Sequence, residues 1–497
     1  MLCRKPLPLA LALAGLLAAG ANAAAPAPAP VATPASAPSQ EVAELLAQIK
    51  RLSARIEALE QKDKATDQAL ATDRVSEREP ELVTRLKAVE MQSLGMLKSA
   101  RTVESLDGIQ VGFSLTTVAQ RPSAAIHQPG SDIDGQFGGS QLNYRGDAFV
   151  TVPLDPIGNT ESKIFAHLRF GQGAGLNDLY SFSKPNASAF RVTSTSPDDS
   201  VAILGQAWYQ ATIPLPFGGF KPHSKETLEV NFGKMDPFLF FDQNAAANDE
   251  TRQFLNTAFV HNPLLDAGGD IGVDRNGFTP GFRVSYVNHA DKREPWRLSL
   301  GVFGAGEGAN YSRFFSSPLI LAQAETQLRL MGGLLGNYRL YYWRTGQAPT
   351  YQDGSARRSG WGLSVDQRVG DGMTLFGRYG QHINGGGARF DKALTAGLEL
   401  AGYDWGRGGD TLGMAAGWLQ SSSGWRADSA SLDVDGNGIP DYGYSARGAE
   451  RVAEVYYRWR LNKQFEVTPS LQLMSHPGAN ADARLFHLFS LRAQLTY

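Results

Sequence analysis

The C-terminal segment of the chain, residues 485–497, alternates between apolar and polar side chains with a period of two. One face carries Leu485, His487, Phe489, Leu491, Ala493, Leu495 and Tyr497, and the other carries Ser490, Arg492, Gln494 and Thr496. Such a period indicates a β-strand with one apolar face and one wet face. A closing strand that ends on an aromatic side chain is typical of outer-membrane barrels. The last strand of a soluble β-sandwich would show the same alternation.

The same alternation recurs in about fifteen segments between Ser105 and Tyr497. Because single-chain bacterial barrels have even strand numbers, the pattern predicts an all-β transmembrane barrel of about sixteen antiparallel strands, one of them undetected. The polar positions between the apolar ones would then line an aqueous lumen. They are Asn143, Arg145, Asp147, His167, Arg169, Glu229, Asn231, Asp366, Arg368, Glu454, Arg458 and Arg460.

The connections between these segments alternate in length. Residues 369–372 and 461–464 are expected to form tight turns, whereas residues 176–199, 240–279, 304–325 and 421–448 are expected to form long loops. Long loops at one rim and short turns at the other are how a porin is built.

The N-terminus predicts export. Arg4 and Lys5 precede an apolar run, and small residues follow at 21–23, so residues 1–23 are expected to be a cleaved signal peptide. Cys3 is the only cysteine and would leave with it, which excludes disulfides from the mature protein. No other apolar run reaches the roughly 20 residues that a membrane helix requires.

Residues 24–40 are rich in Ala and Pro and predict an extended spacer. Residues 41–100 then change to helical spacing, and the first part has apolar residues at the a and d positions of successive heptads: Val42, Leu45, Ile49, Leu52, Ile56 and Leu59. This pattern predicts a periplasmic α-helical coiled coil ahead of the barrel, through which the chain could form a homo-oligomer. A single amphipathic helix is the alternative.

The formal charge of −2 is close to neutral and does not favour a nucleic-acid partner. The sequence contains no HExxH or GxSxG motif, so we expect no enzyme activity and no required cofactor. A barrel-embedded hydrolase remains an alternative, because such enzymes assemble dispersed Ser, His and Asp side chains on a barrel wall.

Two stretches resemble the family of carbohydrate-selective outer-membrane porins. They are residues 231–262, NFGKMDPFLFFDQNAAANDETRQFLNTAFVHN, and residues 450–478, ERVAEVYYRWRLNKQFEVTPSLQLMSHPG, with the ending FSLRAQLTY. The resemblance implies a sixteen-stranded channel for sugars and similar solutes in the outer membrane of a Gram-negative cell. The helical stretch and the final Tyr497 depart from the simpler members. The alternative is a barrel that tethers the outer membrane to the cell wall and carries a general or anion pore.

The first of these stretches contains an acid and amide cluster: Asp242, Asn244, Asn248, Asp249, Glu250 and Arg252. Carboxylates, amides and Arg hold sugar hydroxyls by hydrogen bonds, so this cluster could form a pore constriction if its loop folded into the lumen. The wall residues Arg145, Arg169 and Arg458 would oppose it. The alternative is a solvated loop in which Asn248 and Asp249 cap a short helix.

A second motif lies in the loop at 433–441, DVDGNGIPD. Its oxygen-bearing side chains, Asp433, Asp435, Asn437 and Asp441, alternate around a glycine turn as in calcium-binding loops. The motif predicts a Ca²⁺ site, although Asp, Asn and Gly also simply form turns.

Overall fold

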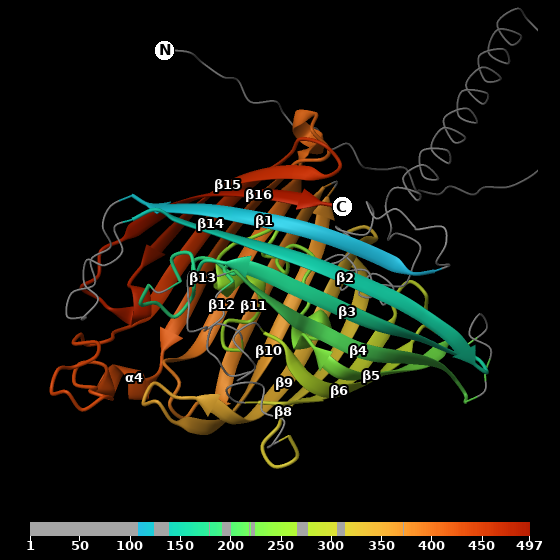
Figure 1. The fold of residues 1–497 in the computed structure, drawn as a ribbon, viewed down its shortest axis with the longest axis horizontal. Coiled ribbons are helices and arrows are strands. Elements are labelled where there is room, and N and C mark those ends of the chain that lie inside the picture. Colours follow the sequence, from blue (N-terminus) through green and yellow to red (C-terminus); the bar gives the residue numbers. More distant parts are fainter. Residues whose placement is uncertain are drawn as a thin grey trace, which may run out of the picture. The chain divides into compact units, whose positions relative to one another are not determined.

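The computed structural model describes residues 108–123 and 139–497, with gaps at 178, 191–199, 218, 220–223, 266–276, 306–313 and 371. The predicted signal peptide, spacer and coiled coil lie outside the described residues. Within them, sixteen antiparallel strands form a closed barrel in which each strand pairs with the next along the chain and β16 pairs with β1 (Figure 1). The predicted barrel is confirmed, and closure excludes the sandwich.

The strand bounds follow the predicted alternation closely. They are β1 (Gln110–Pro122), β2 (Gln141–Ile157), β3 (Thr160–Gln172), β4 (Val201–Leu215), β5 (Glu226–Met235), β6 (Thr279–Asn288), β7 (Trp296–Phe303), β8 (Leu319–Leu330), β9 (Leu334–Pro349), β10 (Ser355–Gly370), β11 (Met373–Asn384), β12 (Phe390–Ala401), β13 (Thr411–Ser421), β14 (Ala449–Arg460), β15 (Phe465–Ser475) and β16 (Phe486–Thr496). Short helices occupy the connections: η1 (Pro237–Leu239), α3 (Thr257–Val260), η3 (Gly402–Trp405), α4 (Ser423–Asp428) and η4 (Pro477–Ala479). No described helix has the length and apolar character needed to cross a membrane.

The usual burial of side chains is inverted. On β16, Leu491 is 52% exposed and its neighbour Arg492 is 1% exposed. Other strands repeat this arrangement, with exposed leucines such as Leu340 and buried charged residues such as Arg339. Apolar side chains therefore face outward, where lipid would cover them, and polar side chains face the lumen.

Strand β8 is the one that the sequence analysis missed, because residues 304–325 were interpreted as a loop. Its inward residues Leu319 and Leu321 are buried in a hydrophobic core inside the barrel, and its outward face carries the small residues Ala322 and Ala324. Apolar residues on the inner face and weakly apolar ones on the outer face hide the period-two signal. The strand bounds on either side of the other long loops and of the tight turns at 369–372 and 461–464 agree with the prediction.

Residues 236–265, which we call the plug segment, fold into the barrel between β5 and β6. Their aromatic side chains Phe254 and Phe259 pack in the inner core with wall residues such as Phe376 and Tyr456. Glycine on the wall makes room for this segment. A Cβ on Gly380 would lie 2.5 Å from the Oδ1 atom of Asn262, a distance that real Cβ atoms essentially never show.

The barrel closes at the chain end through two backbone hydrogen bonds, Tyr497 N to Phe113 O (2.8 Å) and Phe113 N to Tyr497 O (3.0 Å). The Tyr497 residue is 48% exposed, on the lipid side with Leu495. Tyr497→Asp is expected to lower the yield of inserted barrel, because it places a charge on the lipid-facing side at a cost of about 1 kcal/mol or less near the interface. Heat-modifiable migration of outer-membrane fractions measures that yield, with Tyr497→Phe as the control. Equal yields in parent and Tyr497→Asp would contradict this expectation.

Candidate functional site

The plug segment is fastened to the wall through Asp242. This side chain is fully buried, and its Oδ1 atom accepts hydrogen bonds from Arg378 Nε (3.1 Å) and the Tyr341 hydroxyl (2.9 Å). Its Oδ2 atom accepts from the Asn262 backbone N–H at 2.5 Å, which closes the segment on itself. Asp242 has a φ of +53°, a conformation that Asp and Asn tolerate better than most residues.

Asn244 is a second anchor. Its Nδ2 group donates to Ser364 Oγ (3.3 Å) and Val365 O (3.1 Å) on β10, and the neighbouring Ala245 N–H donates to Asp366 Oδ2 (3.3 Å). Asp242 and Asn244 thus have their polar groups turned into the wall. Both residues therefore attach the plug segment to the wall, and their contact with solute stays a prediction.

A third attachment comes from Glu454 on β14. Its two carboxylate oxygens accept hydrogen bonds from the backbone N–H groups of Leu255 and Asn256, each at 2.9 Å. Asn256 then caps α3 by accepting from Ala258 N–H (3.0 Å). The plug segment is therefore attached to wall strands that lie on different parts of the barrel.

Asn248 and Asp249 form a turn. Their backbone N–H groups both donate to Gln253 Oε1, and Asp249 Oδ1 accepts from the backbone N–H and hydroxyl of Thr251 (2.9 and 2.6 Å). Asp249 thus caps a turn, and the helix of this stretch starts later, at Thr257, where Asn256 is the cap. Burial and the adjacent Glu250 raise the pKa of Asp249.

Glu250 faces the wall arginines, as the sequence analysis expected of this cluster. Arg145 Nη1 lies 2.8 Å from Glu250 Oε1, and Arg145 Nε lies 3.0 Å from Asp147. Arg169 pairs with the same Asp147 at 2.6 Å because Asp147 and Arg169 are direct cross-strand partners on β2 and β3. Burial would raise the pKa of Glu250, but the charges of Arg145 and Arg169 outweigh it and hold that pKa below its usual value.

Arg252 forms the second charged contact of the plug segment. Its Nε and Nη2 atoms bind Glu466 on β15 at 3.0 and 2.5 Å. Arg458 and Arg460 approach the same carboxylate more loosely, at 3.8 and 3.9 Å, and Arg458 donates to Thr411 Oγ1 (2.6 Å). Three arginines therefore surround one glutamate.

The residues around Glu250 and those around Glu466 together form what we call the charged belt. Its members are Arg145, Asp147, Arg169, Glu250, Arg252, Arg458, Arg460 and Glu466. Several belt side chains keep some exposure: 23% for Arg252, 16% for Arg169, 15% for Arg458 and 12% for Glu250. Carboxylates and guanidinium groups on facing surfaces create a transverse field and offer hydrogen bonds to polar solutes.

Glu466, Tyr341 and Arg378 are partners of the plug segment that were not predicted from the sequence. Glu466 could have been found, because it begins a polar row with Thr468, Ser470 and Gln472 on β15. Arg378 is harder to find, since its neighbour Gly377 removes the apolar alternation around it.

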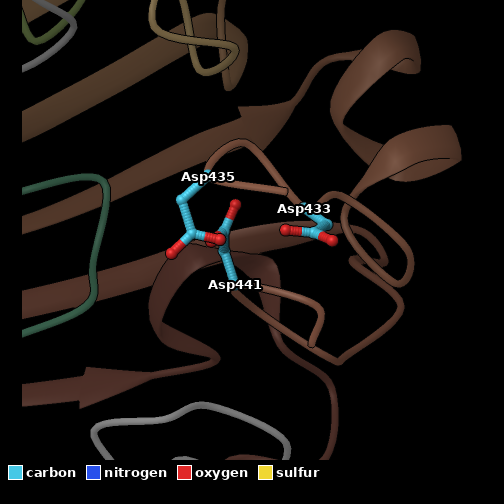
Figure 2. A group of neighbouring side chains, drawn as sticks. All are labelled: Asp433, Asp435 and Asp441. Atoms are coloured by element: carbon cyan, nitrogen blue, oxygen red, sulfur yellow. The ribbon is translucent and has the colours of Figure 1, made fainter. Parts of the chain in front are cut away.

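The predicted calcium loop does bring its carboxylates together. Asp433, Asp435 and Asp441 each place one oxygen within 4.8 Å of the others (Figure 2). Asn437 lies in the same turn, where its N–H groups donate to Asp433 Oδ1 (3.1 Å) and Asp435 (3.0 and 2.8 Å). The backbone N–H of Gly438 also donates to Asp433, and these bonds lower the pKa of Asp433. The donor set is the oxygen-rich kind that Ca²⁺ prefers.

Comparisons with known proteins agree with this architecture. The model of the carbohydrate-selective porin family OprB matches residues 170–497. The structure of Pseudomonas putida OprB at high pH superimposes with a TM-score of 0.61 and 18% identity, covering 79% of this chain and 96% of that one. An uncharacterized protein of Nostoc sp., alr4550, is 24% identical over 281 residues. That match covers 52% of this chain and 44% of the Nostoc protein, so the chain spans less than half the length of this relative.

Proposed function

Because the chain belongs to the OprB family of carbohydrate-selective porins, we propose that its barrel lets small sugars and similar hydrophilic solutes diffuse across the outer membrane. The observation that carries this proposal is the plug segment inside the barrel. It is anchored by Asp242 and Glu454, and it turns Glu250 and Arg252 toward charged wall residues. A solute that crosses the lumen would pass these partly exposed groups.

The chemistry of the charged belt suits transient binding of sugars. A sugar hydroxyl can donate to Glu250 and accept from Arg252, and hydrogen bonds to charged groups contribute about 1.5 to 3 kcal/mol each. Desolvation of the belt and loss of solute mobility offset most of this gain. A pore also requires weak binding, since a solute held tightly cannot leave. A dissociation constant of millimolar order is therefore expected, which corresponds to a binding free energy of about −4 kcal/mol.

Block of the ion current by glucose tests this function. The full chain would be inserted in a planar bilayer, and glucose would be titrated at constant ionic strength. The proposal expects a saturable decrease of current with half-block in the millimolar range. A channel that conducts ions but shows no saturable block would argue for the alternative, a general or anion pore.

The hydrolase alternative has no support. His167 lies 2.8 Å from a carboxylate oxygen of Asp147, and its other ring nitrogen lies near Gln206 (3.5 Å), so no serine of the described residues takes that place.

Calcium binding at Asp433, Asp435, Asn437 and Asp441 is a second proposal, supported by the clustered carboxylates. Ca²⁺ is expected to protect residues 429–448 from proteolysis, because it would bridge side chains that otherwise repel one another, with a dissociation constant of about 10⁻⁴ to 10⁻³ M as in extracellular sites. Limited proteolysis of the full chain in Ca²⁺, Mg²⁺ and EDTA measures this protection, and Asp433→Asn with Asp435→Asn is the matched variant. Identical cleavage in Ca²⁺ and EDTA would contradict the proposal.

The N-terminal module is proposed to lie in the periplasm, where it could form an oligomer or contact the cell wall. Replacing Ile49 and Ile56 with Asp is expected to abolish pairing of the predicted coiled coil, because charges would occupy its a positions. Chemical crosslinking measures pairing, and conductance is expected to persist because the barrel closes without this module. Unchanged crosslinking would contradict a coiled coil that pairs copies of the chain.

A further inference from the structure

Arg492 on β16 is a buried cation without a carboxylate beside it. Its residue is 1% exposed, and its Nη1 atom donates to two carbonyl oxygens of the plug segment, Glu250 O (2.9 Å) and Gln253 O (2.8 Å). Among the residues that the structure describes, its Nε and Nη2 atoms have no hydrogen-bond partner. In the part of the chain that the structure describes, no carboxylate forms an ion pair with Arg492.

Three other buried arginines of the barrel are neutralised directly by a carboxylate. Arg283 lies 3.2 Å from Glu229, Arg378 lies 3.1 Å from Asp242, and Arg339 lies 2.7 Å from Asp366. A buried charge is strongly unfavourable unless it is paired and hydrogen-bonded. An anion bound beside Arg492 would therefore stabilise it.

Two acidic residues whose charges act on Arg492, Glu454 and Asp249, form their hydrogen bonds with the plug segment. Both oxygens of Glu454 accept backbone hydrogen bonds from the plug segment, and Asp249 Oδ1 accepts from Thr251. Burial and Glu250 also raise the pKa of Asp249, which weakens it as a counter-charge.

Further buried polar atoms face inward beside Arg492. Among the described residues, the atoms that lack a hydrogen bond are Arg458 Nε on β14, which has only the 3.8 Å ion pair with Glu466, Ser470 Oγ on β15 and Gln494 Oε1 on β16. Thr468 pairs directly with Arg492, and Ser470 is the next inward residue along β15. Buried polar atoms are almost always hydrogen-bonded, so a group of atoms without a hydrogen bond along adjoining strands indicates a place for a polar ligand. We call Arg492, Arg458, Ser470 and Gln494 the Arg492 seam.

We propose that the Arg492 seam binds an oxyanion, the carboxylate or phosphate group of an acidic sugar, that enters the seam from the lumen. The adjacent Nε and Nη2 donors of a guanidinium group match two oxygens of a carboxylate or phosphate. Arg458 and the Ser470 hydroxyl could donate to the same group, and Gln494 Oε1 could accept from a sugar hydroxyl. Arg458 keeps 15% side-chain exposure and continues the seam to the charged belt. The inference rests on the proposed function, because the solute must enter the lumen.

Current block in planar bilayers tests this inference with the full chain. Glucose, glucuronate, glucose 6-phosphate and inorganic phosphate would be titrated at equal ionic strength. Glucuronate and glucose 6-phosphate are expected to block at concentrations about tenfold below glucose, since a bidentate charged contact is added. If inorganic phosphate blocks as strongly as glucose 6-phosphate, the seam binds the oxyanion alone. If phosphate blocks more weakly than glucose 6-phosphate, the seam also binds the sugar.

Arg492→Lys is the central variant, because it keeps the charge and a donor for the plug carbonyls but removes the paired Nε and Nη2 donors. It is expected to weaken block by glucuronate about tenfold and to leave block by glucose unchanged. Ser470→Ala is a milder variant that tests the same seam if Arg492→Lys does not fold. Arg121 is an exposed arginine on β1, and Arg121→Gln is the control. It is expected to change neither block by glucuronate nor block by glucose.

Block by glucuronate no stronger than block by glucose would overturn the inference, and so would equal block in parent and Arg492→Lys. If glucose itself neither blocks nor permeates, the proposed function fails first. If glucose blocks and acidic sugars show no advantage, the inference about the seam fails alone.

Discussion

Asp242→Asn is expected to free the plug segment from the wall and to raise single-channel conductance, with loss of sugar block. Arg378 would keep its buried charge and lose its carboxylate, and breaking a buried ion pair on one side costs about 3 to 5 kcal/mol. Asn tolerates the φ of +53° at this position, so the effect would come from the lost charge and not from backbone strain.

Conductance and thermal unfolding of the purified barrel measure this effect. The double variant Asp242→Asn with Arg378→Gln is the control, because it removes both charges and is expected to recover part of the lost stability. Parental conductance and unfolding temperature in Asp242→Asn would show that the segment is held by other contacts, such as those of Glu454.

Glu250→Gln is expected to shift ion selectivity toward anions and to weaken sugar block about tenfold. The change removes the acid that faces Arg145 and Arg169, and a hydrogen bond to a charged group contributes about 1.5 to 3 kcal/mol. Arg145 keeps its ion pair with Asp147 at 3.0 Å, so the barrel should remain folded. Glu250 is a better position for this substitution than Asp249, because the Asp249 carboxylate stabilises the turn by accepting a hydrogen bond from Thr251.

The reversal potential in a salt gradient measures selectivity. Glu294→Gln, an exposed acid in the connection between β6 and β7, makes the same charge change outside the lumen and should leave selectivity unchanged. Equal reversal potentials and equal sugar block in Glu250→Gln and the parent would remove the charged belt from the solute path.

The alternation of residues was sufficient to predict the barrel, because lipid outside and water inside impose the same period on nearly every strand. The alternation did not identify β8, because Leu319 and Leu321 pack in the inner core and make the lumen-facing side of this strand apolar. The same signal identified Arg145, Arg169 and Arg458 as lumen residues, since polar positions on strands must face inward.

Pairing between the plug segment and the wall could not be predicted. Asp242 and Arg378 are 136 positions apart, and Arg252 and Glu466 are 214 apart. No local pattern records which acid meets which arginine across a lumen. Acids with different contacts also look alike in sequence, which is why Asp242, which anchors the plug segment, was grouped with Glu250, which faces Arg145.

Liposome swelling tests the central claim, that small sugars cross the lumen past an anchored constriction, most directly. Liposomes carrying the full chain would be diluted into isotonic glucose, a disaccharide and a trisaccharide, with empty liposomes as the baseline. The account predicts fast swelling in glucose, a steep decrease with sugar size, and loss of that size dependence in Asp242→Asn. Swelling in glucose no faster than that of empty liposomes would contradict it.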